Sequence, residues 1–157
     1  MRKLFLVRHG QTHPAQNQES DLERRLTPQG ESDIRSLRNT LEKVISGDTA
    51  YVCSPALRAR QTAGLLTIPE QEPRLHAELY HGMADDYLDV IARYIGHESV
   101  IVVGHNPVIS RLSWQLSSGG TGGFSPGTCV EFTYPDAASA SALLKPVGFL
   151  VHPVGGS

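Results

Sequence analysis

The sequence has few cysteines and no long hydrophobic segment, and each absence excludes a class of protein. Two cysteines, Cys53 and Cys129, cannot form the framework of a small disulfide-rich domain, and their apolar neighbours indicate buried thiols. No apolar run approaches the roughly 20 residues that cross a bilayer, so we expect no membrane association. Because Met1-Arg2-Lys3 leads directly into an apolar stretch, we also expect no signal peptide and a cytoplasmic location.

An excess of positive charge is also missing, which argues against a nucleic-acid partner. The chain carries 14 Lys and Arg against 16 Asp and Glu. Arginines do cluster locally, at Arg24-Arg25 and at Arg58 and Arg60, and in a nearly neutral chain such clusters fit a small anionic substrate better than a polyanion. No Walker or dinucleotide glycine pattern follows a strand, so no nucleotide site is indicated.

Metal-ligand spacing is absent as well. No two of the seven histidines share i,i+4 spacing within a predicted helix, and there is no Cys-x-x-Cys. We therefore expect neither a metal nor another cofactor.

What the sequence does contain is an alternation of strand-like and helix-like segments. Apolar runs at 4–7, 50–53 and 100–103 predict buried strands. Apolar residues at helical spacing predict helices that begin at the pairs Thr27-Pro28, Ser54-Pro55, Asp85-Asp86 and Asn106-Pro107. Further expectations are a polar loop at 13–23, a mobile glycine-rich loop at 117–127, and strands at 74–79, 129–134 and 142–144. The pattern predicts one α/β domain, residues 1–157, with three α/β/α layers around a largely parallel central sheet.

Chemically active side chains directly follow three of these predicted strands. The first strand runs into Arg8-His9-Gly10, the second into Ser54 and then Arg58, and the strongest into His105-Asn106. Parallel strands place such ends at one edge of the sheet, where open α/β sheets bind ligands. Arginine matches phosphate oxygens with its planar fork, and a neutral imidazole can attack phosphorus. The sequence therefore predicts a phosphoryl-transfer site, to which Gly10 allows close approach.

Three motifs resemble one known family. Leu6-Val7-Arg8-His9-Gly10-Gln11-Thr12 resembles the signature of the histidine phosphatase superfamily, the phosphoglycerate-mutase-like enzymes. The segments Ser54-Pro55-Ala56-Leu57-Arg58-Ala59-Arg60-Gln61-Thr62-Ala63 and Val103-Gly104-His105-Asn106-Pro107 resemble its second and third conserved segments. The resemblance covers residues 3 to about 133 and implies a phosphoglycerate-mutase-like fold and a metal-independent phosphatase.

The same resemblance implies roles for individual residues. His9 matches the nucleophile that becomes phosphorylated, and Arg8, Arg58 and His105 match the other members of the phosphate pocket. Gly10 and Asn106 lie inside the motifs and are candidates for substrate binding.

One further segment is similar to a subgroup of that family. Residues 21–30, which include Arg24, are similar to a segment of the short SixA-type phosphohistidine phosphatases, and this likeness implies a phosphohistidine protein as the substrate. Arg24 is then a candidate for the pocket mouth, with a solvated arginine before a helix as the alternative. Larger family members use a glutamate as proton donor, and Glu78 is the nearest candidate, one residue off the usual spacing. A solvated carboxylate at a strand edge explains Glu78 equally well, and helix capping explains Asp85 and Asp86.

Two alternatives to a SixA-like enzyme stay open at this point. Gly10-Gln11-Thr12 follows the mutase pattern, which keeps a small-molecule phosphatase or a mutase-like enzyme in consideration. A non-catalytic module that binds phosphate or a phosphoprotein is an alternative of another class. The presence of both His9 and His105 argues against this module, because binding alone needs only arginines. The identity of the substrate and the oligomeric state are left open.

Overall fold

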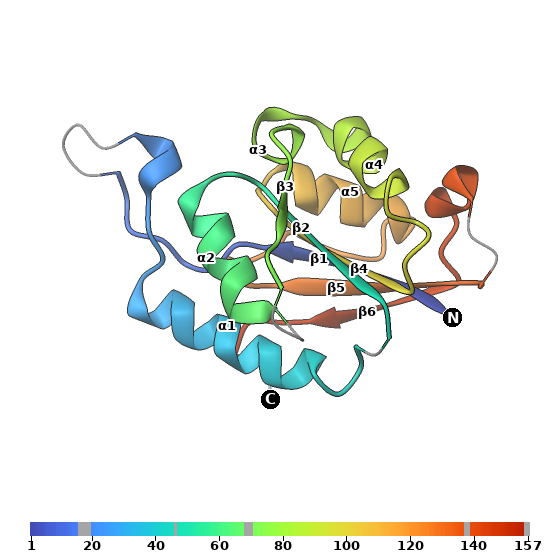
Figure 1. The fold of residues 1–157 in the computed structure, drawn as a ribbon, viewed down its shortest axis with the longest axis horizontal. Helices are drawn as coiled ribbons and strands as arrows, with labels where there is room; N and C mark the ends of the chain where they lie inside the picture. The colour runs from blue at the N-terminus through green and yellow to red at the C-terminus, as the bar shows by residue number, and fades with distance from the viewer. Residues whose placement is uncertain (16–19, 46, 68–70, 137–138, 156–157) are drawn as a thin grey trace.

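In the computed structural model, six strands form one sheet with helices on both of its faces (Figure 1). The structure describes residues 1–15, 20–45, 47–67, 71–136 and 139–155. The strands are β1 (Arg2–Arg8), β2 (Thr49–Cys53), β3 (Arg74–Leu75), β4 (Ser99–Gly104), β5 (Cys129–Tyr134) and β6 (Gly148–His152). The helices are α1 (Pro28–Leu41), α2 (Leu57–Leu66), α3 (Glu78–His81), α4 (Ala84–Ala92) and α5 (Val108–Leu116), with short 3-10 helices η1 (Asp21–Glu23) and η2 (Ala140–Leu144).

The strand order across the sheet is β3-β2-β4-β1-β5-β6. Strands β3, β2, β4 and β1 are mutually parallel, whereas β5 runs antiparallel to both β1 and β6. The prediction of a largely parallel sheet between two helical layers is confirmed. The arrangement matters for function because β2, β4 and β1, which lead into the three motifs, are direct neighbours.

The alternation of side chains along β1 explains why its sequence is apolar without interruption. Leu4 and Leu6 join the core on the side of α4 and α5, whereas Phe5 and Val7 join the core on the side of α1 and α2. Successive residues of a strand point to opposite faces, so a strand covered on both faces must be apolar throughout. The same reasoning applies to β4, all of whose residues are buried.

Helix α1 begins where the sequence predicts. The Thr27 hydroxyl accepts a hydrogen bond from the Gly30 amide at 2.9 Å, and Pro28 occupies the first turn. Ile34, Leu37 and Leu41 form its buried stripe. The helix ends at Leu41, and the chain reaches Gly47, whose positive φ of 78° suits glycine, after a short turn.

Two other helices begin later than predicted, α2 by two residues and α5 by one. Ser54 accepts a hydrogen bond from the Ala56 amide at 3.2 Å, but α2 begins only at Leu57. Helix α5 begins at Val108 instead of at the predicted pair. The polar residues of both pairs bond to other parts of the site, as described below. In α4, Asp86 lies in the first turn and accepts from the Met83 amide at 2.8 Å.

Three predicted segments have a different secondary structure. The predicted strand at 74–79 is the two-residue β3 followed by α3, so Glu78 lies on a helix and not at a strand edge. The predicted strand at 142–144 belongs to η2, which begins where the Ser139 hydroxyl accepts from the Ala142 amide. The sheet is closed instead by β6, which the sequence analysis missed. Residues 21–23 of the predicted loop form η1, and residues 16–19 lie outside the described part.

Candidate active site

Three neighbouring strands deliver their motifs to the same edge of the sheet. The backbone N–H of His9 donates to Gly104 at the end of β4, at 3.2 Å, and the N–H of Ser54 donates to Val103 at 3.1 Å. These bonds continue the ladders between β1, β4 and β2 by one residue. The structure therefore brings His9, Ser54 and His105 side by side at the carboxyl ends of parallel strands.

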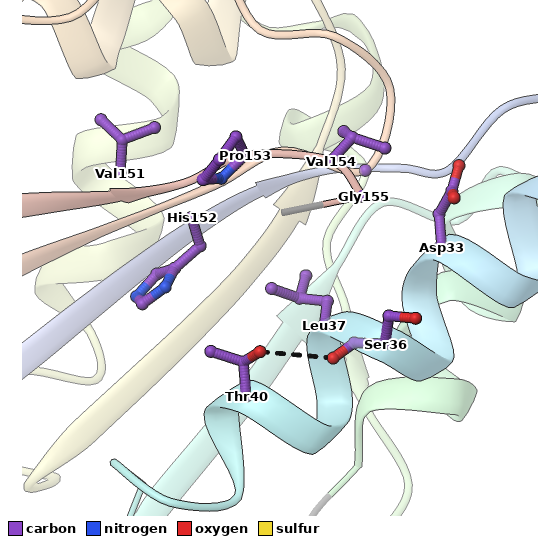
Figure 2. A pocket seen from close by; sticks show the side chains of 10 residues that line it. Asp33, Ser36, Leu37, Thr40, Val151, His152, Pro153, Val154 and Gly155 are labelled. Atoms are coloured by element: carbon purple, nitrogen blue, oxygen red, sulfur yellow. Dashed lines mark hydrogen bonds between the residues drawn. The ribbon is translucent and has the colours of Figure 1, made fainter. Parts of the chain in front are cut away.

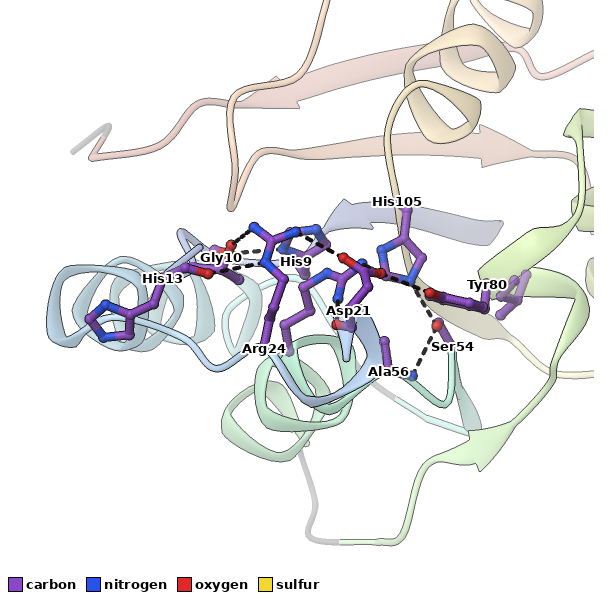
Figure 3. Close-up of polar contacts among 12 residues, drawn as sticks. His9, Gly10, His13, Asp21, Arg24, Ser54, Ala56, Tyr80 and His105 are labelled. Carbon is purple, nitrogen blue, oxygen red and sulfur yellow. Dashed lines mark hydrogen bonds and ion pairs between the residues drawn. The ribbon is translucent and has the colours of Figure 1, made fainter. Parts of the chain in front are cut away.

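His9 is held as a neutral ring, whose Nε2 has no hydrogen-bond partner among the described residues. Its Nδ1 lies 2.8 Å from the carbonyl oxygen of Gly10 (Figure 3). A carbonyl oxygen only accepts, so Nδ1 carries the ring proton and Nε2 keeps its lone pair. Burial lowers the pKa of His9 to about 4, the contact with Gly10 opposes this shift, and the charges of Arg58 and Arg8 reinforce it. An imidazole in this state is a nucleophile near pH 7.

Gly10 permits the close packing around this ring. A side chain on Gly10 would meet the Gly30 carbonyl oxygen and Ile34 at 3.1 Å, and Leu26 at 3.3 Å. The Gly10 amide donates to the Thr62 hydroxyl at 3.1 Å. The glycine of the motif is thus explained by the contact between the β1 end and α1.

His105 lies against His9, with ring centroids 5.2 Å apart. Its Nε2 is 2.7 Å from the Ser54 hydroxyl, and its backbone N–H donates to the Tyr87 hydroxyl at 3.1 Å. Burial is the largest cause that lowers the pKa of His105 to about 3, followed by the charges of His9 and Arg58. Both rings are therefore neutral at pH 7.

Two arginines flank the histidine pair. Arg8 donates from Nη1 to the Phe124 carbonyl at 2.8 Å, and Arg58 donates from Nη1 and Nη2 to the backbone and side chain of Asp21, at 2.7 and 3.0 Å. The Nε atoms of both arginines are buried without a hydrogen-bond partner in the described residues. Buried donors of this kind, next to a neutral nucleophile, suit a bound tetrahedral oxyanion.

A family model for the histidine phosphatase superfamily (branch 1) matches residues 4–84, more than half of the chain. The chain belongs to the histidine phosphatase superfamily. An uncharacterized protein of Picosynechococcus sp. is 28% identical over 127 residues, which cover 76% of each chain. The resemblance deduced from the three motifs is therefore confirmed.

Solved structures of histidine phosphatases share the fold. A candidate phosphohistidine phosphatase SixA from Nakamurella multipartitia is 29% identical with a TM-score of 0.83, and the match covers 98% of this chain and 96% of that one. The protein histidine phosphatase SixA complexed with tungstate is 27% identical with a TM-score of 0.72, over 85% and 89% of the two chains. These findings indicate a phosphatase, and hence a hydrolase, with the phosphoglycerate-mutase-like fold.

Glu78, the candidate proton donor of this histidine phosphatase, makes its contacts elsewhere. Its carboxylate pairs with Arg93 at 2.9 Å. Within the described residues, no hydrogen bond or ion pair joins Glu78 to His9, Arg58 or His105. The ion pair with Arg93 draws the Glu78 side chain to α4.

Asn106 fixes a loop of this histidine phosphatase beside the anion site. Its side-chain amide donates to the Phe124 carbonyl at 3.1 Å, the same oxygen that Arg8 binds, and its Oδ1 accepts from the Ser110 hydroxyl at 2.6 Å. The predicted glycine-rich loop thereby lies next to Arg8. The side chain of Asn106 is used for this attachment.

The site of this histidine phosphatase also contains two residues that the sequence analysis missed. Asp21 on η1 accepts from Arg58 and from the Tyr80 hydroxyl at 2.8 Å (Figure 3). The Tyr80 ring stands edge-on to His105, with centroids 5.5 Å apart. Arg24 reaches the same place, since it donates to Asp21 at 3.1 Å and to the Thr12 hydroxyl at 2.6 Å. Asp21 lies within residues 21–30, the segment that is similar to SixA-type enzymes, but its contact with Arg58 and the position of Tyr80 could not be predicted, because 37 and 22 residues separate the two from Arg58.

A pocket of about 200 Å³ lies apart from this edge of the sheet, between α1 and the end of β6 with the residues that follow it (Figure 2). Asp33, Ser36 and Thr40 line one side, and His152 and Gly155 line the other. The pocket includes none of the three motif side chains His9, Arg58 and His105. We therefore place the candidate active site at the sheet edge, where neutral imidazoles and guanidinium groups meet.

The described residues contain no cluster of three or more His, Cys, Asp or Glu that could hold a metal ion. Among the described helices, none is both long enough and apolar enough to cross a bilayer.

Proposed function

We propose that this phosphatase removes the phosphoryl group from phosphohistidine side chains of a protein, through a covalent intermediate on His9. The observation that carries the proposal is the pair of neutral rings, His9 and His105, 5.2 Å apart, beside the unpartnered Nε atoms of Arg8 and Arg58. The likeness to SixA structures supports the choice of substrate.

The first step transfers the phosphoryl group to His9. Its Nε2 attacks phosphorus, the bond between phosphorus and the substrate nitrogen breaks, and the substrate imidazole keeps the electron pair of that bond. Arg8 and Arg58 stabilise the charge on the phosphoryl oxygens in the transition state. We assign the ring proton of His105 to Nδ1, since Ser54 can accept from the Ala56 amide and donate to Nε2. Nδ1 has no partner in the described residues and can donate to a phosphoryl oxygen.

The second step returns His9 to its neutral state. Water attacks phosphorus, the bond to Nε2 breaks, and the nitrogen takes back its lone pair while both protons of the water stay on the released phosphate. The proton on Nδ1 is held throughout by the Gly10 carbonyl. The cycle needs no external base.

The proton balance favours phosphohistidine over an alkyl phosphate. A phosphohistidine whose other ring nitrogen is protonated leaves as a neutral imidazole and takes up no proton. An alkoxide leaving group requires an acid. Glu78, the glutamate considered for that role, pairs instead with Arg93. The site therefore fits a leaving group that departs without assistance.

The test compares kcat/KM for a phosphohistidine peptide with the values for 3-phosphoglycerate and a hexose phosphate. We expect the peptide to be preferred by more than about tenfold, a difference of ~1.4 kcal/mol in transition-state binding. The Glu78→Gln variant should keep peptide turnover within about twofold of the wild type. A small ester preferred by more than tenfold, with its hydrolysis abolished in Glu78→Gln, would identify a small-molecule phosphatase that uses acid assistance.

A further inference from the structure

Asp21 places a carboxylate directly beside the proposed anion site. Its Oδ2 accepts from Arg58 Nη2 at 3.0 Å and from the Tyr80 hydroxyl at 2.8 Å, and its Oδ1 accepts from Arg24 Nη1 at 3.1 Å (Figure 3). The Asp21 side chain is 48% exposed, whereas that of Arg58 is 7% exposed. The carboxylate thus lies at the mouth of the site, outside the buried guanidinium.

This carboxylate is ionised at pH 7. Burial alone would raise the pKa of Asp21, but the hydrogen bonds from Tyr80, Arg58 and Arg24 outweigh burial and hold the pKa well below its usual range. A fixed negative charge therefore stands next to any substrate that enters.

The contacts of Arg58 indicate how close a bound oxyanion would lie to the Asp21 carboxylate. Both terminal nitrogens of Arg58 bind Asp21, one through the backbone carbonyl and one through the carboxylate, while Nε is left without a partner in the described residues. An oxyanion that binds Nε is separated from the Asp21 carboxylate by one guanidinium group. Like charges at such separations repel each other measurably, even near the protein surface.

We propose that Asp21 is a specificity-determining residue, whose charge disfavours substrates with a second anionic group next to the transferred phosphoryl group. Phosphoryl groups on a neutral or cationic carrier, such as an imidazole, are favoured by comparison. The inference rests on the proposed phosphatase function and narrows its substrate class. Arg24 and Arg58, which bind Asp21, and Arg8 keep the phosphoryl site itself attractive to anions, so the discrimination acts on the part of the substrate that carries the phosphoryl group.

A matched pair of substrates isolates this effect. The aryl esters 3-carbamoylphenyl phosphate and 3-carboxyphenyl phosphate have nearly the same shape and differ by one negative charge. We expect the ratio of their kcat/KM values, neutral over charged, to fall about fivefold in Asp21→Asn, in line with one screened charge contact. The matched control is Glu23→Gln, which removes one exposed acidic charge from the same short helix and should keep the ratio within about twofold.

Loss of Arg58 positioning must be separated from loss of charge. Asp21→Asn is expected to slow both esters because Arg58 is held less firmly, but this common loss cancels in the ratio. Asp21→Glu keeps the charge and should keep the wild-type ratio. If Asp21→Asn is too slow to assay, the dissociation constants of 3-carbamoylphenyl and 3-carboxyphenyl phosphonate supply the same ratio without turnover.

The outcomes distinguish this inference from the proposed function. An unchanged ratio in Asp21→Asn, or an equal change in Glu23→Gln, would overturn the specificity role while wild-type turnover still supported a phosphatase. If the wild-type protein hydrolysed neither the two esters nor a phosphohistidine peptide, the proposed function itself would fail.

Discussion

Around His9, three buried nitrogens have no hydrogen-bond partner in the described part of the chain: Nε of Arg8, Nε of Arg58 and Nδ1 of His105. Buried polar atoms in folded proteins are nearly always paired, because an unpaired one costs about 1–3 kcal/mol. An oxyanion bound between these side chains would satisfy them together. At the scale of residues, these three donors are the groups that the proposed function assigns to the phosphoryl oxygens.

Removal of Arg58 should lower kcat/KM far more than removal of Arg24, although both arginines bind Asp21. Arg58→Ala removes a buried donor beside the histidines and should lower kcat/KM by ~30- to 1000-fold, or roughly 2–4 kcal/mol. Arg24→Ala should lower kcat/KM far less, because its hydrogen bonds go to Thr12, His13 and Asp21 at the mouth and its charge lowers the pKa of His9 less than those of Arg58 and Arg8. Steady-state kinetics on one aryl phosphate measures both variants. Equal losses would show that the pocket is assigned to the wrong arginine.

His9 should stay neutral across the physiological range. An ordinary histidine titrates near pH 6.5, but the pKa of His9 is about 4, so its lone pair is available at every pH above roughly 5. The unfolded chain takes up this proton near pH 6.5, so the contribution of His9 to stability is complete above that pH and is lost as the pH falls toward 4. An NMR titration, with the ring signals assigned by comparison with His9→Gln, measures the midpoint. A midpoint near 6.5 would contradict the buried, neutral assignment.

Site residues that belong to a short motif after a predicted strand could be predicted. Site residues that are recognised only by contacts with partners distant in the sequence could not. Arg8, His9, Arg58 and His105 follow predicted strands, so their meeting place follows from a parallel sheet. Asp21 lies in the SixA-like segment 21–30, but its partners are 37 and 59 residues away, so the sequence did not predict its role in the site.

At the scale of elements, Tyr87 of α4 ties the second histidine to the fold. Its hydroxyl donates to the Leu79 carbonyl on α3 at 2.6 Å and accepts from the His105 amide at 3.1 Å. A side chain on Gly104 would meet the same hydroxyl at 2.6 Å, so β4 must end in glycine here. Helices α3 and α4 thereby set the position of the His105 backbone.

Removal of this hydroxyl should affect both stability and activity. Tyr87→Phe leaves a buried N–H and a buried C=O unpaired, which should lower the free energy of unfolding by about 1–3 kcal/mol. A shifted His105 should also lower kcat/KM by about tenfold or more. Tyr134→Phe is the matched control, because it removes a buried hydroxyl that donates to Leu143, away from the site, and should reduce stability alone. Urea unfolding and kinetics separate the two effects, and unchanged kcat/KM in Tyr87→Phe would contradict the positioning role.

Elements were predictable where both faces of a strand are covered. The uninterrupted apolar runs of β1 and β4 follow directly from burial on two sides. Strand β6 lies at the edge of the sheet, and four of its five residues are exposed. Its sequence therefore lacks the apolar pattern of a buried strand. The polar residues Ser54 and Asn106 mark helix starts poorly here, because their side chains bond to His105 and Phe124.

At the scale of the whole molecule, the order of the strands decides which motif residues lie side by side. The chain visits β1, β2 and β4 in sequence, but in the sheet β4 lies between β2 and β1. This order places His105 beside His9 on one side and beside Ser54 on the other. The sequence predicts that the three motifs lie at one edge of a parallel sheet. It does not predict which strands are neighbours, because pairing between distant strands leaves no local pattern.

The proposed mechanism requires that His9 carries the phosphoryl group during turnover. Rapid quenching with a labelled aryl phosphate should trap a phosphoryl group that is labile in acid and stable in alkali, and peptide mapping should place it on His9. His9→Ala should trap none, whereas His105→Ala should still trap label on His9 at a reduced rate. A label that maps to a serine, or to His105 in the wild-type protein, would contradict the account.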